Sequence, residues 1–366
     1  MAKILLTGAF GNVGTSTLNE LVKHDHHIRC FDIPTKRNKK KAKQYKDFKG
    51  KIEFFWGDLR NSSDVDKAVE DREVIIHLGA IIPPLANNKP EIAEPVNVGG
   101  TKNILNAMKK QENPPRLLFS SSVATYGDVR HKGLDYIIKI DDEFNPSPHD
   151  HYARHKVKCE EMIRKSGLEW VIFRFSAISP IDQGLDPIMY DVPLDTPIEH
   201  TDTGDAGRAM ARAAISDEVV GKTLHIAGGK INRMPYEQFV GGILEAMGIG
   251  RLPKEAYGKE PFHCGYMDTT ESQRILQYQE HTFEDYIAIT KKRLAFERIL
   301  VFIFRPIVRY WLLRQSPYYK AHIKSMKQYL KPKRTQRTPS VAKTKGIKAK
   351  DITSKIIDKE PTKTGK

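Results

Sequence analysis

The chain has 366 residues, of which 39% are hydrophobic and 29% charged, so it can form a packed globular core and is not a disordered chain. Its formal net charge of +15 lies at the C-terminus: residues 291–330 carry ten Lys or Arg against one Glu, residues 331–366 carry twelve against three acidic residues, and the other 290 residues sum to −3. Charge confined to one end argues against a nucleic-acid-binding body.

The cysteines and the N-terminus bear on the cellular compartment. Cys30, Cys159 and Cys264 form no CxxC pair, which argues against a disulfide framework or a zinc site. The apolar start, residues 1–6, runs directly into a glycine motif that cleavage would destroy, so we expect no signal peptide. These features predict a cytoplasmic protein without a metal.

Short apolar segments alternate with segments of helical periodicity along the first half of the chain. The predicted strands are 3–8, 28–32, 52–56, 74–78, 116–120 and 170–174. The predicted helices include 12–23, 64–71, 90–112 and 151–166, and a lysine-rich surface insertion covers 35–51. Strands that are apolar almost throughout must be covered on both faces, so the alternation predicts an α/β fold with a doubly wound parallel sheet.

Three glycines follow the first predicted strand, in the sequence TGAFGNVG of residues 7–14. At a strand-to-helix turn, Gly8, Gly11 and Gly14 can make the tight turn, admit a pyrophosphate close to the backbone and allow close helix–strand packing. The N-terminus of the helix beyond them offers free N–H groups to phosphates. The motif therefore predicts a dinucleotide site.

Asp32 ends the second predicted strand. A carboxylate at this place can bind both ribose hydroxyls of an adenosine and repels a 2′-phosphate, so NAD is favoured as the cofactor. Lys36 and Arg37 stand close enough in the sequence to leave NADP as the less favoured alternative.

Eight motifs, in order over roughly residues 1–290, resemble the extended short-chain dehydrogenases/reductases of the NAD-dependent epimerase/dehydratase family. They are Thr7–Gly14, Asp32, Gly57–Leu59, His77–Ala80, Asn97–Thr101, Phe119–Gly127, Tyr152–Lys156 and Arg174–Pro180. The resemblance implies a Rossmann-type NAD-binding domain over 1–176 and, over 177–290, a smaller, mainly substrate-binding lobe interleaved with late Rossmann elements. The cofactor contacts that it implies are Thr7, Gly8, Phe10, Gly11, Asn12, Val13, Gly14, Asp32, Asp58, Leu59, Leu78, Gly79, Ala80, Tyr152 and Lys156.

Tyr152 and Lys156 stand four residues apart on a predicted helix, so both project from one face. A lysine ammonium beside the phenol, together with the positive nicotinamide ring of NAD⁺, would lower the pKa of Tyr152 and let it take a proton from a substrate hydroxyl as hydride leaves. By the family's register, Ser122 is the catalytic hydroxyl that orients the substrate oxygen, and Asn97 keeps the active-site helix and its proton path in order.

The reactions of this family share that hydride step and differ in the groups around it. Its 4,6-dehydratases carry an Asp-Glu pair where this chain has Val123 and Ala124, so dehydration is disfavoured. Ser120–Ser122 resembles the sugar 4-epimerases, whereas Ser179 replaces the usual glycine of the Arg174–Pro180 loop and the segment 81–84 is apolar.

The resemblance thus implies an NAD-dependent epimerase or dehydrogenase acting at a secondary alcohol or ketone of a small molecule, such as a nucleotide sugar. A hydroxysteroid-dehydrogenase-like enzyme acting on a lipid-like alcohol at a membrane surface is the alternative. A non-catalytic NAD-binding regulator is a third reading, which the complete Ser122, Tyr152 and Lys156 set disfavours. The candidate substrate contacts are Ile82, Ser122, Val123, Arg174 and Ser176.

Residues 291–330 form a basic amphipathic helical segment. On a helical projection Lys291, Arg298, Arg305 and Arg309 share one narrow stripe, and most of the remaining circumference is apolar. The arginines and Pro306 argue against a spanning helix. The segment is expected to contact either an anionic membrane surface, as a peripheral protein on the cytoplasmic side, or protein, meaning its own body or a partner in a homodimer.

Beyond this segment, residues 331–366 are lysine-rich with little apolar content, so we expect them to be disordered. RNA or DNA binding by the basic C-terminus is disfavoured because no platform of aromatic and basic residues accompanies the charge.

Overall fold

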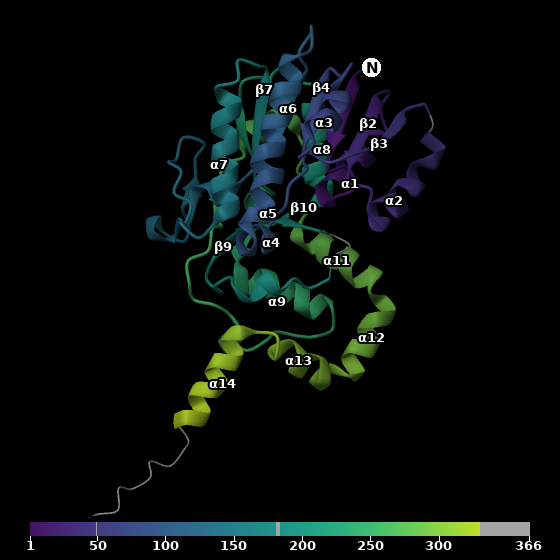
Figure 1. The fold of residues 1–366 in the computed structure, drawn as a ribbon. Helices are drawn as coiled ribbons and strands as arrows, with labels where there is room; N and C mark the ends of the chain where they lie inside the picture. The colour runs from purple at the N-terminus through teal and green to yellow at the C-terminus, as the bar shows by residue number, and fades with distance from the viewer. Residues whose placement is uncertain (49, 181–183, 330–366) are drawn as a thin grey trace, which may run out of the picture. The chain divides into compact units, whose positions relative to one another are not determined.

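The computed structural model describes residues 1–48, 50–180 and 184–329, so the predicted disordered tail at 331–366 lies outside the described residues. A seven-stranded sheet carries the order β11-β7-β5-β4-β1-β2-β3, and all its neighbouring strands are parallel (Figure 1). Its strands are β1 (Lys3–Thr7), β2 (His27–Asp32), β3 (Ile52–Trp56), β4 (Val74–His77), β5 (Arg116–Ser122), β7 (Trp170–Phe175) and β11 (Thr223–Ile226). The predicted α/β fold with a doubly wound parallel sheet is confirmed.

Helices cover both faces of the sheet, as near-continuous apolar strands require. On one face, α1 (Asn12–Leu21) and α8 (Thr203–Ala213) pack on a core that includes Ile4, Leu6 and Phe173. On the other face, α3 (Ser62–Val69), α6 (Gly100–Lys109) and α7 (His151–Arg164) pack on Leu5, Ile75 and Phe119. The alternation of buried side chains along β1 thus supplies both cores.

The predicted helix at 90–112 is divided into three parts. Helix α5 (Pro90–Glu94) is followed by a turn of π-helix at Pro95–Gly99 and then by α6. Proline at position 95 has no N–H to donate to a preceding turn, which favours a change of helical register here. The insertion at 35–51 contains α2 (Lys36–Ala42) and a 3₁₀ segment, Lys43–Phe48.

The second half of the chain adds a smaller set of elements beside the carboxyl ends of the strands. They include the short strands β9 (Pro197–Glu199) and β12 (Arg233–Pro235), which pair antiparallel, and the helices α9 (Tyr236–Ala246) and α11 (Phe283–Arg293). Helix α10 (Thr270–Leu276) instead packs beside α8 and β11, and its Leu276 belongs to the core of the main sheet. The other short strands of this half are β8 (Ile178–Ser179), β10 (Thr201–Asp202) and β13 (Tyr266–Met267). The first half of the chain also contains the short strand β6 (Ile137–Ile138), which pairs with β13, and the short helix α4 (Leu85–Asn88). A separate apolar core forms in the second half around Tyr190, Tyr236 and Leu244.

The predicted amphipathic segment consists of separate helices. Helix α12 (Ala295–Ile303) and helix α13 (Arg305–Leu313) meet at Phe304, because Pro306 stands in the first turn of α13, and α14 spans Pro317–Tyr329. Within the described residues, no helix is long and apolar enough to cross a membrane.

Candidate active site

The predicted cofactor residues gather at the carboxyl ends of β1, β2, β3 and β4, which are neighbours in the sheet. Thr7 ends β1 and Asp32 ends β2, while Asp58 and Leu59 follow β3 and Leu78 to Ala80 follow β4. In parallel α/β sheets this edge is where ligands bind. Six of the predicted cofactor residues also line the cavity described below: Asn12, Val13, Leu78, Ala80, Tyr152 and Lys156.

The turn between β1 and α1 can pack this tightly only because it is built from glycines. Gly8 has φ +65°, and a Cβ there would lie 2.8 Å from the Cα of Gly79. A Cβ on Gly14 would lie 2.0 Å from the carbonyl oxygen of Gly8. The helix α1 then begins at Asn12 with its first N–H groups directed at the turn. This geometry fits a dinucleotide phosphate.

Asp32 is held in place by N–H donors. Its Oδ2 accepts from the Phe10 N–H at 2.9 Å, and its Oδ1 accepts from the Ile33 N–H at 2.8 Å and from Asn38 Nδ2 at 3.0 Å. Burial raises the pKa of Asp32, and these backbone bonds and the charge of Lys41 oppose the rise. A carboxylate oxygen can accept two hydrogen bonds, so Oδ2 keeps capacity for a ribose hydroxyl.

Tyr152 and Lys156 lie on the first turns of α7, facing the end of β5. The Lys156 ammonium donates to the carbonyl oxygen of Ser120 and lies 4.7 Å from the centroid of the Phe119 ring and 5.6 Å from that of Tyr152. Burial lowers the pKa of Lys156 to about 8. The lysine therefore stays largely protonated at neutral pH, beside the phenol ring.

The fall in the pKa of Tyr152 expected with NAD⁺ bound stays a prediction, and in the protein alone the pKa shifts the other way. Burial raises the pKa of Tyr152 well above that of a free phenol, the nearby charge of Asp150 adds to the rise, and a hydrogen bond with Ser122 only partly opposes it. Desolvation disfavours the phenolate, and the Lys156 ammonium points to the Ser120 carbonyl. In this state the tyrosine is a proton donor.

Asn97 acts on backbone next to the cavity. Its side chain accepts from the Ile81 N–H at 2.8 Å and donates to the Ile81 carbonyl at 2.9 Å. Its own carbonyl, in the π-helical turn, accepts from the Thr101 hydroxyl at 2.7 Å. Asn97 thus fixes the segment that leads to Ile82, and it is not among the residues that line the cavity.

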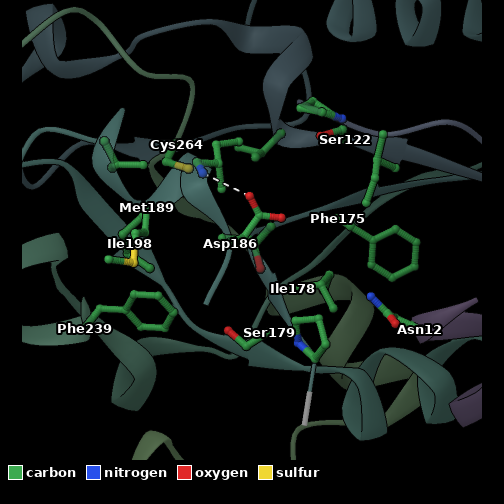
Figure 2. A pocket seen from close by; sticks show the side chains of 18 of the residues that line it. Asn12, Ser122, Phe175, Ile178, Ser179, Asp186, Met189, Ile198, Phe239 and Cys264 are labelled. Carbon is green, nitrogen blue, oxygen red and sulfur yellow. Dashed lines mark hydrogen bonds between the residues drawn. The ribbon is translucent and has the colours of Figure 1, made fainter. Parts of the chain in front are cut away.

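The cavity has a volume of about 470 Å³ and is lined mainly by apolar side chains. Figure 2 shows Ser122 and Asn12 across the cavity from Met189, Ile198 and Phe239, with Asp186 between the two groups. The apolar lining comes from several elements: Ile82, Pro83, Val123, Phe175, Ala177, Ile178, Pro180, Leu185, Ile188, Met189, Val192, Ile198, Phe239, Val240, Ile243, Met247 and Phe262. Among the described lining residues, Lys156 and Arg293 are the only Lys or Arg side chains.

Four of the five predicted substrate contacts line this cavity: Ile82, Ser122, Val123 and Ser176. Arg174 does not, and that expectation is corrected. Its guanidinium donates to the two carboxylate oxygens of Glu160 at 3.0 and 2.8 Å and to the Ile140 carbonyl at 2.9 Å. Arg174 and Glu160 are both buried, and each neutralises the other, so the arginine has a structural role.

Asp186 and His263 are among the polar lining residues that reasoning from the sequence missed. The Asp186 carboxylate accepts from the Ile188 N–H at 2.9 Å, the bond drawn in Figure 2. His263 Nδ1 lies 2.6 Å from the carboxylate of Asp150, whose other oxygen caps α7 by accepting from the Ala153 N–H at 3.0 Å. The His263–Asp150 pair joins segments 113 residues apart, and nothing local in the sequence marks it.

Comparison with known proteins places residues 4–179 within the model of the NAD dependent epimerase/dehydratase family. A putative UDP-glucose 4-epimerase of Methanocaldococcus jannaschii is 30% identical over 186 residues, which cover 48% of this chain and 55% of that relative. A decarboxylating sterol-4-alpha-carboxylate 3-dehydrogenase of Candida albicans is 30% identical over 172 residues, 45% of this chain and 46% of the relative. The chain thus spans about half the length of these curated relatives.

Among solved structures, the UDP-glucuronic acid 4-epimerase of Bacillus cereus, in complex with UDP-glucuronic acid and NAD, superposes with a TM-score of 0.67. The match covers 80% of this chain and 99% of that one at 18% sequence identity. At this identity the likeness shows a shared fold.

Proposed function

Since the chain belongs, through residues 4–179, to the NAD-dependent epimerase/dehydratase family, we propose that it is an NAD-dependent oxidoreductase acting on a secondary alcohol or ketone of a largely apolar molecule. The proposal assigns cofactor binding to residues 1–176 and most of the substrate binding to 177–290. The observation that carries it is the cavity, which joins Ser122, Tyr152 and Lys156 to a long apolar lining.

NAD, when bound at the glycine turn, supplies the hydride acceptor or donor. Asp32 would hold its adenosine ribose, and the N-terminus of α1 would face its phosphates. Lys156, next to Tyr152, would hold the nicotinamide ribose with its ammonium. Gly8 and Gly14 keep the turn compact, because a side chain at either position would collide with backbone, and this leaves the N-terminus of α1 facing the turn.

Tyr152 and Ser122 would bind the substrate oxygen from two sides. Both side chains line the cavity and interact with each other, so one substrate oxygen placed against both hydroxyls can receive a bond from each. In the reducing direction, the carbonyl carbon gains hydride and its oxygen takes the phenol proton of Tyr152, giving the alcohol. In the oxidising direction, Tyr152 takes that proton back. The raised pKa of Tyr152 supports the role of acid in the protein alone.

The apolar lining favours a lipid-like substrate over a nucleotide sugar. A nucleotide diphosphate carries charges that cationic and polar groups must match, and a buried charge without partners is costly. In the described lining, Arg293 is the one cation besides Lys156. A fused-ring or isoprenoid alcohol, in contrast, gains from burial against such a lining.

Epimerisation of a nucleotide sugar is the second candidate. The Ser120–Ser122 sequence supports it, as does Arg293, which could bind one phosphate.

For a lipid-like substrate, the proposal also places the enzyme in the cytoplasm at a membrane surface. The three cysteines are buried and unpaired, in keeping with a reducing compartment.

The test is turnover with purified full-length protein. With sterol-type secondary alcohols in mixed micelles, we expect NAD to be reduced, which the absorbance of the reduced nicotinamide measures. We expect no interconversion of UDP-glucose and UDP-galactose. Conversion of the nucleotide sugar without turnover of any lipid alcohol would establish the second candidate. Binding of NAD without turnover of lipid alcohols or nucleotide sugars would indicate a non-catalytic NAD-binding regulator.

A further inference from the structure

Helices α12 and α13 expose large apolar side chains on one side, here called the outer face. It consists of Phe296, Ile299, Leu300, Phe302, Ile303, Phe304, Ile307, Tyr310 and Trp311. Phe302, Ile307 and Trp311 are 67%, 65% and 62% exposed. Contiguous exposed apolar surface of this kind marks a place where another molecule binds.

The arginines that share these helices point the other way, to the body of the protein. Arg305 Nε donates to the Ile249 carbonyl at 2.9 Å, and Arg309 Nη1 donates to the carbonyls of Gly250 and Arg251, at 3.0 and 2.6 Å. These carbonyls follow the C-terminus of α9, where a positive charge is favoured. Part of the basic stripe predicted from the sequence, namely Arg305 and Arg309, therefore binds the body of the protein.

Apolar contacts fix the same orientation. Val301, Val308 and Leu312 pack on the core around Tyr190, and the Tyr190 hydroxyl donates to the Leu312 carbonyl at 2.9 Å. The inner sides of α12 and α13 are thus anchored by apolar packing and by hydrogen bonds. The outer face is held outward by these contacts.

The charges around the outer face favour an anionic lipid bilayer over a second copy of the chain as its binding partner. Exposed cations flank it at both ends, and Glu297 is the only acidic residue between 291 and 324. The exposed cations are Lys291, Lys292, Arg293, Arg314, Lys320 and Lys324. A second copy of the chain would bring like charges together, whereas an anionic bilayer offers both acyl chains and negative headgroups.

We propose that the outer face inserts into the boundary between headgroups and acyl chains of an anionic lipid bilayer. The surface and the cavity share elements: Thr290 and Arg293 at the end of α11, and Met247 just after α9, line the cavity, and α12 follows α11 directly. A Cβ on Gly248 would lie 3.1 Å from the Arg298 carbonyl, so α12 lies against the turn that ends α9. Figure 1 shows α11, α12 and α13 following one another beside α9.

This arrangement would let an apolar substrate pass between the bilayer and the cavity, an extension that rests on the proposed function. Bilayer binding itself does not depend on the reaction. The two claims therefore fail separately: vesicle binding without turnover of lipid alcohols would leave this inference standing and remove the extension.

The experiment is co-sedimentation of the full chain with vesicles of phosphatidylcholine alone or with phosphatidylserine added. We expect binding to the anionic vesicles, and we expect Phe302→Ser/Ile307→Ser/Trp311→Ser to weaken it by at least about 100-fold, since each fully buried side chain of this size is worth roughly tenfold or more. The matched control is Leu134→Ser/Ile215→Ser/Ile231→Ser, which removes three exposed apolar side chains elsewhere and should bind as the unaltered chain does.

Calorimetric titration with NAD checks that both triple variants are folded, because every changed side chain is exposed and distant in sequence from the glycine turn. Equal binding by the outer-face variant and the unaltered chain would overturn the proposal and assign the attraction to the basic C-terminus. Binding to neutral vesicles as strong as to anionic ones would contradict the proposed preference of the outer face for anionic lipid. A dimer in gel filtration that the outer-face variant converts to a monomer would assign the surface to a second copy.

Discussion

Two buried histidines, one at the sheet edge and one in the lobe, differ in how their ring nitrogens are satisfied. At the sheet edge, His77 has a threonine hydroxyl at each ring nitrogen, Thr7 at 2.7 Å and Thr101 at 3.2 Å. In the lobe, His200 Nδ1 lies 3.1 Å from the Ser179 hydroxyl, and its Nε2 is buried without a hydrogen-bond partner in the described part of the chain. His77 is thus held by directional bonds at both ring nitrogens, whereas His200 is held by one such bond and by packing against Phe239, Phe283 and Tyr286.

The difference indicates a division of work. Transfer of hydride and a proton requires atoms to be placed to within a fraction of an ångström, which hydrogen bonds can do. Selection of an apolar substrate requires a complementary surface, and dispersion contacts supply it without directional partners. Changes at the sheet edge should therefore affect the rate of the chemical step, and changes in the lobe should affect substrate affinity.

The largest expected effect is that of Tyr152→Phe, which removes the proposed acid and keeps the ring. We expect kcat to fall by at least about 10²-fold, with KM and NAD affinity nearly unchanged, because the proton transfer is lost in the transition state alone. Tyr286→Phe is the matched control: Tyr286 lines the same cavity from the lobe, and its hydroxyl donates to the Pro180 carbonyl at 3.1 Å. Its kcat should stay within about tenfold of the original. Near-normal turnover by Tyr152→Phe would refute the catalytic assignment.

A substitution in the lobe should give the opposite pattern. Ile243→Ser places a hydroxyl in the apolar lining, so KM for a lipid-like alcohol should rise about tenfold while kcat changes little. Ile243→Val, which only shortens the side chain, is the control. Steady-state kinetics separates the two parameters. A fall in kcat at constant KM would mean that the lobe takes part in the chemistry and that the division is wrong.

At the cofactor site, Asp32 is expected to determine the preference for NAD over NADP. Its charge should make NAD bind about tenfold or more tightly than NADP, and Asp32→Ala should narrow that preference by relieving repulsion of the 2′-phosphate. Calorimetric titration of both variants with both cofactors measures it. Lys36→Ala, on the exposed start of α2, serves as the control and should leave the preference for NAD in place. Equal affinities of the unaltered chain for NAD and NADP would contradict this role of Asp32.

The last expected effect is on stability in acid. Burial lowers the pKa of His77 to about 3 and those of His200 and His225 to about 4. Between about pH 6.5 and 4 the unfolded chain binds protons that the folded chain does not, so the free energy of unfolding should fall as pH falls, by about 1 kcal/mol per pH unit for each group.

Urea unfolding at several pH values measures this slope, and His200→Phe should reduce it. The ring of His200 lies against Phe239, Phe283 and Tyr286, so an aromatic replacement suits the site. A slope that His200→Phe leaves unchanged would show that this histidine titrates normally in the folded state.

Sequence patterns predicted what local spacing determines. All six expected strands form, because each is a short apolar run bounded by turn residues. The glycine turn and the pairing of Tyr152 with Lys156 on α7 follow from spacing alone. Strand β11 was missed: its four residues carry too little pattern, and it joins the sheet through pairing with β7, some fifty residues earlier.

The remaining features depend on contacts between distant segments. Arg174 lies in a motif that pointed to substrate, yet its partner Glu160 is on α7. The inward orientation of Arg305 and Arg309 is set by carbonyls after α9, which a helical projection cannot include. A stripe of one kind of residue shows that two faces differ, and only packing decides which of them is buried.

The central claim is that this chain uses NAD to oxidise or reduce an apolar molecule. Mass spectrometry of the small molecules released when the purified full-length protein is denatured tests it most directly. We expect NAD or NADH together with a lipid-like secondary alcohol or its ketone. Release of a nucleotide sugar, with no apolar companion, would contradict it.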